Sequence, residues 1–115
     1  MSDKAWKAFE RRISKIFPGA TRRGTYTGSK SHGKPDLICE GWSVECKLLS
    51  RPSFQDILDA AYQAEANAEK TTDIPVAVIK RKGDLDVNSL VVMRLAVFEQ
   101  LFINSVEEPN GQNLE

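Results

Sequence analysis

The stretch PDLICEGWSVECKL, residues 35–48, decides the fold that this chain is expected to adopt. Two short runs, 36–39 and 42–48, flank Glu40-Gly41, and alternating runs around a two-residue link with glycine predict a β-hairpin. Successive side chains of a strand point to opposite faces, so the hairpin is expected to have one wholly apolar face. That face carries Leu37, Cys39, Trp42, Val44, Cys46 and Leu48, and the other carries Asp36, Ile38, Ser43, Glu45 and Lys47. A slip of one residue would mix the two sets, which specifies the register.

This register places two carboxylates side by side. Asp36 is expected opposite Glu45, and directly opposed residues have Cβ atoms roughly 4.5–5.5 Å apart. Like charges at that distance destabilise a sheet unless a positive group lies between them. Two close carboxylates suit Mg²⁺, which takes one or two protein carboxylates and keeps several waters. Lys47 points to the same face, where a lysine can orient or deprotonate an attacking water or offset charge in a transition state.

The spacing of these groups resembles a known signature. Pro35-Asp36, followed after eight residues by Glu45-Cys46-Lys47, resembles the motif of the PD-(D/E)XK nuclease superfamily. Its placement on the two strands of a predicted hairpin strengthens the resemblance.

A first helix is predicted from a cap at Ser2 or Asp3 to about Phe17, before Pro18-Gly19. Its apolar stripe contains Trp6, Phe9, Ile13, Ile16 and Phe17. Glu10 falls on the same stripe, where an acid must be paired, bind a metal or stay protonated. Two interpretations are open: Glu10 reaches the Asp36/Glu45 site, or it lies at the edge of the stripe and pairs with Arg11, Arg12 or another neighbour.

The remaining elements follow from similar patterns. Strands are predicted over 20–27, 73–80 and 90–95, and the apolar run IPVAVIK suits a strand covered on both faces. A helix over 53–70 begins with a capping box of Ser53 and Asp56. Its buried stripe is expected to hold Phe54, Ile57, Leu58, Ala61, Ala64 and Ala68. Gln63, beside that stripe, is either a hydrogen-bond partner of water on a metal or an ordinary surface amide. A last helix is predicted over 96–103, before a flexible tail over about 104–115.

The predicted fold is therefore α/β in a single domain, residues 1–115, with a mixed sheet of about five strands flanked by helices. The order α-β-β-β-α-β-β-α resembles the restriction-endonuclease-like core of the PD-(D/E)XK superfamily over about residues 1–103. Within it, the chain looks like the small Holliday junction resolvases of phages and archaea and their VRR-NUC relatives. The sequence Phe9-Glu10-Arg11-Arg12 resembles the acid-bearing first helix of that group.

The resemblance implies a function and a set of roles. Asp36, Glu45, the main-chain carbonyl of Cys46 and, directly or through water, Glu10 would bind Mg²⁺ or Mn²⁺, and Lys47 would assist the attacking water. The implied activity is an endodeoxyribonuclease that cuts four-way DNA junctions during recombination, repair or phage DNA processing. A homodimer is implied as well, with the alanine-rich helix or Phe98, Leu101 and Phe102 as alternative contacts. The alternatives are a nicking, flap-cutting or restriction-like nuclease of this superfamily, or a non-catalytic nucleic-acid-binding module.

Charge is distributed unevenly along the neutral chain. Residues 1–34 hold nine Lys/Arg and two acids, a net charge of +7, and residues 35–115 carry −7. The basic third suggests a polyanionic partner, although two mutually neutralising faces would give the same count. The expected DNA-contacting residues are Arg11, Arg12, Arg22, Arg23, Lys30 and Lys34. In the loop GSKSHGKP, Ser29 and Ser31 are candidates for a supporting hydroxyl, and His32 is either a general base or simply exposed.

Composition limits the compartment. The sequence has no signal-peptide pattern and no apolar run long enough to span a bilayer, so a cytoplasmic protein, in the host cell if phage-encoded, and no membrane partner are expected. Cys39 and Cys46 are predicted to be reduced thiols in the core.

Overall fold

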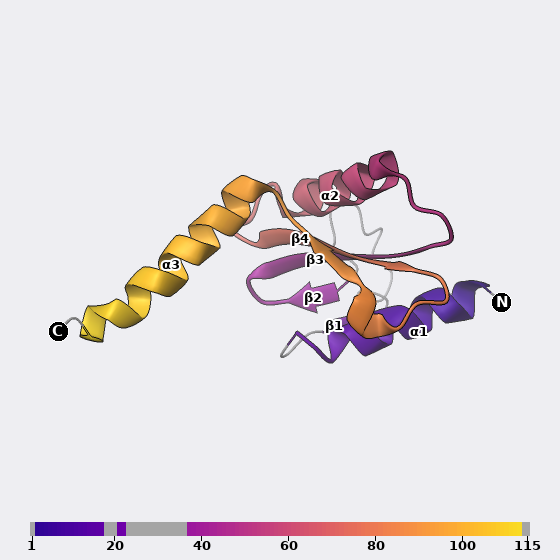
Figure 1. Ribbon diagram of the computed structural model, residues 1–115, viewed down its shortest axis with the longest axis horizontal. Helices are drawn as coiled ribbons and strands as arrows, with labels where there is room; N and C mark the ends of the chain where they lie inside the picture. Colours follow the sequence, from indigo (N-terminus) through magenta and orange to yellow (C-terminus); the bar gives the residue numbers. More distant parts are fainter. Residues whose placement is uncertain (1, 18–20, 23–36, 114–115) are drawn as a thin grey trace.

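The computed structural model describes the backbone of residues 2–17, 21–22 and 37–113. The chain contains both helices and strands, and Figure 1 shows helices on both sides of a central sheet. In chain order, the elements are α1 (Ser2–Ser14), β1 (Thr21–Arg22), β2 (Leu37–Cys39), β3 (Trp42–Leu49), α2 (Phe54–Ala68), β4 (Ile74–Arg81), the 3₁₀ helix η2 (Asp86–Asn88), β5 (Leu90–Val92) and α3 (Leu95–Asn113). The predicted α/β class, a mixed sheet flanked by helices, is confirmed.

The hairpin forms at the predicted link with the predicted register. β2 and β3 are antiparallel, and the pairs are Leu37 with Val44, Ile38 with Ser43 and Cys39 with Trp42. Gly41 closes the turn at φ +89°, a left-handed conformation that residues with a Cβ rarely adopt. The predicted fourth pair includes Asp36, which lies outside the described residues.

The sheet is mixed because a helix connects its two longest strands. β3 and β4 run parallel in register from Trp42 opposite Ile74 to Leu49 opposite Arg81, and α2 is the crossover between them. With β2 they form a three-stranded mixed centre. The two-residue β1 extends the sheet beyond β2, and the three-residue β5 extends it antiparallel to β4.

Each face of the parallel pair has its own core. On the α1 side, Phe9 and Ile13 pack against side chains of β3 and β4 in a cluster completed by Val44, Cys46, Val76 and Val78. On the α2 side, Ala60 packs against Ala77 and Ile79. The central part of β4 is buried on both faces, as its continuous apolar run predicts.

The first helix is shorter than predicted. α1 ends at Ser14, and the amide of Ile16 donates to the carbonyl of Ile13 at 2.9 Å, an i to i−3 bond that tightens the chain. Ile16 leaves the helical phase and is 67% exposed, so its predicted burial is wrong. Phe17 still reaches the core, with its ring centroid 5.9 Å from that of Trp42.

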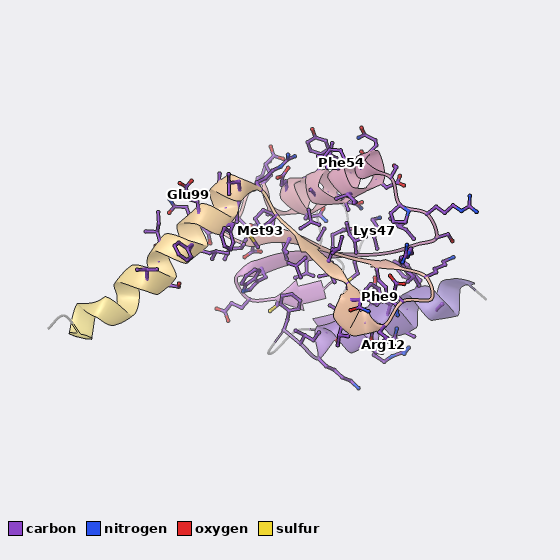
Figure 2. All side chains as sticks on the ribbon, viewed as in Figure 1. Phe9, Arg12, Lys47, Phe54, Met93 and Glu99 are labelled. Carbon is purple, nitrogen blue, oxygen red and sulfur yellow. The ribbon has the colours of Figure 1, made fainter. Side chains whose placement is uncertain are left out.

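The second helix begins as predicted and packs differently. Ser53 and Asp56 form the predicted capping box. Phe54, predicted to be buried, is 73% exposed and projects from the outer side of α2 (Figure 2). The predicted burial of Ala61, Ala64 and Ala68 is confirmed, and Ala60 is buried with them. Their small side chains let the helix lie close to the sheet, which leaves no room for a phenylalanine beneath it.

The carboxyl-terminal region also differs from expectation. β5 ends at Val92 rather than at residue 95, and α3 continues to Asn113 through the residues predicted to form a tail. No glycine or proline interrupts the sequence between residue 95 and Pro109, so nothing stops the helix where the tail was expected.

α3 leaves the body of the molecule after its first turn (Figure 1). Its start is attached to α2 by Arg94, whose Nη2 donates to Glu65 Oε1 at 3.2 Å and whose guanidinium lies 4.9 Å from the ring centroid of Tyr62. In the described part of the chain, no helix is long and apolar enough to cross a membrane.

Candidate functional site

Glu45 is the most deeply buried acid among the described residues, with 2% of its surface exposed. Its neighbours Val44 and Cys46 point into the α1-side core, so strand alternation turns Glu45 to the face that α2 covers. Burial of an acid is unfavourable unless polar partners compensate. The surroundings of this carboxylate therefore identify the candidate site.

Two donors from two different elements approach the two oxygens of that carboxylate. Lys47 Nζ lies 3.6 Å from Glu45 Oε2, and Asn67 Nδ2 donates to Glu45 Oε1 at 3.5 Å. The Lys47 side chain is 33% exposed, so the ammonium connects the buried acid to the protein surface. The result is a carboxylate with a cation at its solvent side and an amide at its helix side.

The alanines of α2 make this arrangement possible. Ala64 is buried, and its carbonyl accepts a hydrogen bond of 3.0 Å from Ser43 Oγ, two residues before Glu45 in β3. This bond joins the helix backbone to the strand. Asn67, one turn further along α2, is thereby brought within reach of Glu45.

The other predicted site residues fall into two groups. Asp36 and the basic loop lie outside the described residues, so the geometry of the acid pair stays a prediction. The same holds for Arg23, Lys30, Lys34, Ser29, Ser31 and His32. Arg22 belongs to β1, where it pairs with Leu37 next to the hairpin.

Glu10 is 4% exposed and comes from α1. The adjacent Phe9 packs with Val44 and Cys46, on the sheet face opposite the one that Glu45 occupies. Within the described ranges, no three side chains of His, Cys, Asp or Glu form a group able to hold a metal ion. The described residues thus do not join Glu10 and Glu45 in such a group.

Arg12, a predicted DNA contact and a possible partner of Glu10, is engaged elsewhere. Its guanidinium makes a bidentate contact with Asp86 of η2, with Nη2 donating to Oδ1 at 3.2 Å. Lys80 Nζ donates to the same Oδ1 at 2.7 Å. The hydrogen bond from Arg12, and then that from Lys80, lower the pKa of Asp86 from 3.8 to about 2. Arg12 therefore ties α1 to the segment between β4 and β5, whereas Arg11 is exposed.

The amide that contacts Glu45 is not the one that the sequence suggested. Gln63 is exposed, which agrees with its interpretation as a surface amide. Asn67 was missed, although it follows Ala60 by seven residues and Ala64 by three. That spacing puts it on the same side of the helix as the buried alanines, and it is a usable sequence signal.

Cys46 lies between the two charged residues of β3. Its side chain is buried in the α1-side core, and within the described residues neither Cys46 nor Cys39 forms a disulfide bond. Comparisons of this chain with protein-family models, curated proteins and solved structures find no significant match. The argument for function therefore depends on the site itself.

Proposed function

We propose that this chain is a metal-dependent endonuclease with a restriction-endonuclease-like core, of the PD-(D/E)XK type, acting on branched DNA such as the Holliday junction. The observation that carries the proposal is the pair of Glu45 and Lys47, whose charged groups lie 3.6 Å apart on a strand of the predicted hairpin. A carboxylate and an ammonium at alternate positions of one strand suit phosphodiester hydrolysis with a divalent cation.

The donor set fits Mg²⁺ or Mn²⁺, which prefer hard oxygen ligands. In the proposal, Glu45 and Asp36 hold the ion with the main-chain carbonyl of Cys46. Glu10 is left out of the ligand set, because α1 packs on the sheet face opposite the one that Glu45 occupies. Asp36 directly precedes Leu37, which pairs with Val44 beside Glu45. When bound, the ion supplies a Lewis acid that favours deprotonation of water and offsets phosphoryl charge.

The protein residues have separate roles in the proposed step. Lys47 orients the attacking water and places positive charge beside the phosphoryl group as negative charge develops there. The water oxygen bonds to phosphorus as the bond to the 3′ oxygen breaks. The water loses its proton to solvent, and the leaving oxygen takes one up. The products are a 5′-phosphate and a 3′-hydroxyl.

The basic amino-terminal third supplies the proposed DNA surface. Lys7 and Arg11 are exposed on α1, and Lys15 is exposed directly after it. We also include Arg22, Arg23, Lys30 and Lys34 in this surface and leave out Arg12, because its guanidinium bonds Asp86. Phosphate contacts of this kind give a strong salt dependence of binding.

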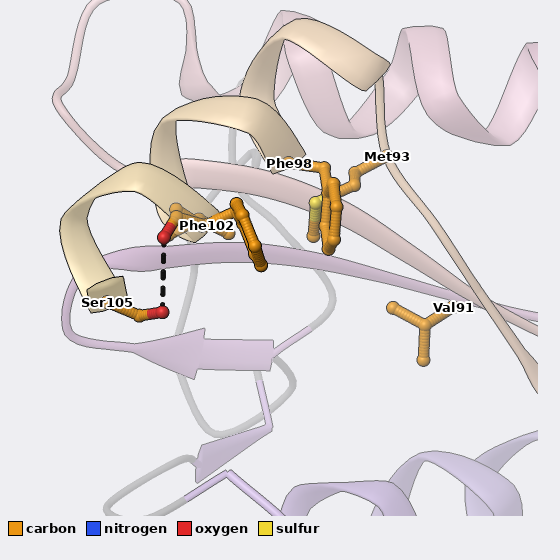
Figure 3. Close-up of a pocket in the computed structure, with 6 residues that line it drawn as sticks. Val91, Met93, Phe98, Phe102 and Ser105 are labelled. Carbon is orange, nitrogen blue, oxygen red and sulfur yellow. Dashed lines mark hydrogen bonds between the residues drawn. The ribbon is translucent and has the colours of Figure 1, made fainter.

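The proposed homodimer uses α3. The alanines of α2, the alternative contact, are buried against the sheet within the same chain. On α3, by contrast, Phe98 and Phe102 are 52% and 56% exposed, and they stack with ring centroids 6.1 Å apart. They line a groove of about 500 Å³ together with Val91 and Met93 (Figure 3). In the proposal, a second α3 related by a two-fold axis covers this groove, and two such chains would present two sites to a junction.

Sedimentation of the full chain tests the dimer. Phe102→Lys is expected to convert a dimer into a monomer, because it places a charge in the apolar contact. Phe54→Lys, at an exposed phenylalanine outside the groove, is the matched control. A wild-type chain that sediments as a monomer at high concentration contradicts the dimer.

Cleavage assays with labelled junction, flap, duplex and single-stranded DNA test the activity. Alanine at Asp36 or Glu45 is expected to abolish Mg²⁺-dependent cutting of the junction with little effect on junction binding. Glu40→Ala, which removes an exposed acid from the hairpin link, is the matched control. Full activity of both site variants refutes the site. Cutting of plain duplex instead favours a restriction-like nuclease, and cutting of no substrate favours a binding module.

A further inference from the structure

Asn67 contacts the proposed ligand Glu45 from outside the strand that carries it. Its amide nitrogen donates to Oε1 at 3.5 Å, whereas Lys47 Nζ lies 3.6 Å from Oε2. Each carboxylate oxygen of Glu45 thus has its own polar partner, Oε1 a hydrogen bond from α2 and Oε2 an ion pair with β3. Because the terminal torsion of a glutamate is soft, two donors on opposite oxygens restrict the plane of the carboxylate.

We propose that Asn67 is a positioning residue that fixes the carboxylate of Glu45 for a divalent cation, an inference that rests on the proposed function. A neutral amide gives one oxygen a hydrogen bond and adds no charge to the site. The carboxylate then keeps one orientation, which an ion of strict coordination geometry requires. Polar groups that hold a ligating carboxylate typically change metal affinity or activity about 10–100-fold when removed.

The position of Asn67 argues against a packing role alone. The sheet-facing positions of α2 before and after it are alanines, which bring helix and sheet together. Asparagine is a poorer helix former than alanine and supplies little apolar area. Asparagine at position 67 therefore lowers the helix propensity and the apolar contact relative to alanine, and it adds a hydrogen bond to a buried acid.

Isothermal titration of the full chain with MnCl₂ alone tests this role without relying on turnover. Asn67→Ala is expected to raise the Kd for Mn²⁺ about 10–100-fold while the thermal midpoint stays close to that of the wild type. Asn67→Gln keeps the amide on a longer side chain and is expected to recover part of the affinity. Gln55→Ala is the matched control, since it removes another α2 amide, one that bonds only Asp59 in the described structure.

Glu45→Ala separates the two hypotheses in the same titration. If Glu45→Ala loses Mn²⁺ binding and junction cleavage while Asn67→Ala binds Mn²⁺ like the wild type, the positioning role is overturned and the proposed function stands. If Glu45→Ala binds and cuts like the wild type, the proposed function itself fails.

Discussion

The two faces of the β3–β4 pair are built on different principles. On the α1 side, Phe9, Ile13 and Val44 are at most 2% exposed and fill the space with large apolar groups. On the α2 side, the helix contributes alanines, and the strand contributes the buried polar residues Ser43 and Glu45. Val44 and Glu45 are neighbours in sequence, so a single strand serves both faces.

This difference between the two faces assigns stability mainly to the α1 side and the candidate site to the α2 side. Burial of large apolar side chains is the main favourable term in folding, so the α1 side is expected to carry most of the free energy of unfolding. The α2 side gives up apolar area, and its small residues let a helix come close enough to reach a carboxylate. Mutations on the two faces should therefore have different consequences.

The largest expected effect on stability is at the centre of the α1 side. Phe9 is fully buried, and Phe9→Ala removes a ring whose loss typically destabilises a protein by about 3–5 kcal/mol. Urea unfolding followed by circular dichroism measures the difference. Ile16→Ala is the matched control on the same predicted stripe, because Ile16 is 67% exposed and its loss is expected to change stability by less than about 0.5 kcal/mol.

Equal losses of unfolding free energy in Phe9→Ala and Ile16→Ala would contradict this description of the α1 side. They would mean that the α1 contact extends past Ser14, as the uninterrupted apolar stripe of the sequence predicts.

That stripe shows where sequence reasoning succeeded and where it failed. The hairpin register follows from strict alternation around Gly41, and the Ser53 capping box is local chemistry; both were predictable. The exposure of Ile16 depends on a tightened helix end, and that of Phe54 on how closely the alanines let α2 approach. Both are tertiary effects that periodicity alone does not contain.

The candidate site divides in the same way. The pairing of Glu45 with Lys47 was predictable because both lie on one face of one strand. The contact of Glu45 with Asn67 joins residues 22 positions apart, and it requires the distance between helix and sheet to be known. The length of α3 was not predicted, because the residues after 103 were interpreted as a flexible tail.

A smaller effect is expected where the α2 side joins helix to strand. Ser43→Ala removes the buried hydrogen bond to the Ala64 carbonyl and is expected to reduce the free energy of unfolding by about 1 kcal/mol. Ser105→Ala provides the control, because the hydroxyl of Ser105 also donates to a backbone carbonyl, that of Phe102, but is exposed. Guanidinium unfolding of both variants measures the change in free energy of unfolding. Equal changes would mean that the buried hydrogen bond stabilises the protein no more than the exposed one.

The smallest effect is expected at the rim of the α1 side, where Asp86 bonds Arg12 and Lys80. These bonds lower the pKa of Asp86 from 3.8 to about 2, so the folded state favours the carboxylate. The resulting stability is complete above about pH 4 and is lost as the pH falls toward 2. Because Asp86 and Arg12 are partly exposed, this stability should amount to less than about 1 kcal/mol.

Urea unfolding of wild type and Asp86→Asn from pH 2 to 7 measures this contribution: the difference in free energy of unfolding should be constant above about pH 4 and vanish toward pH 2. Asp59→Asn, which removes a carboxylate from the outer side of α2, is the control for general charge effects. If the gap in free energy of unfolding persists unchanged at pH 2, Asp86 stabilises the fold through packing and not through its charge. The rim of the α1 side would then be stabilised in the same way as its apolar centre.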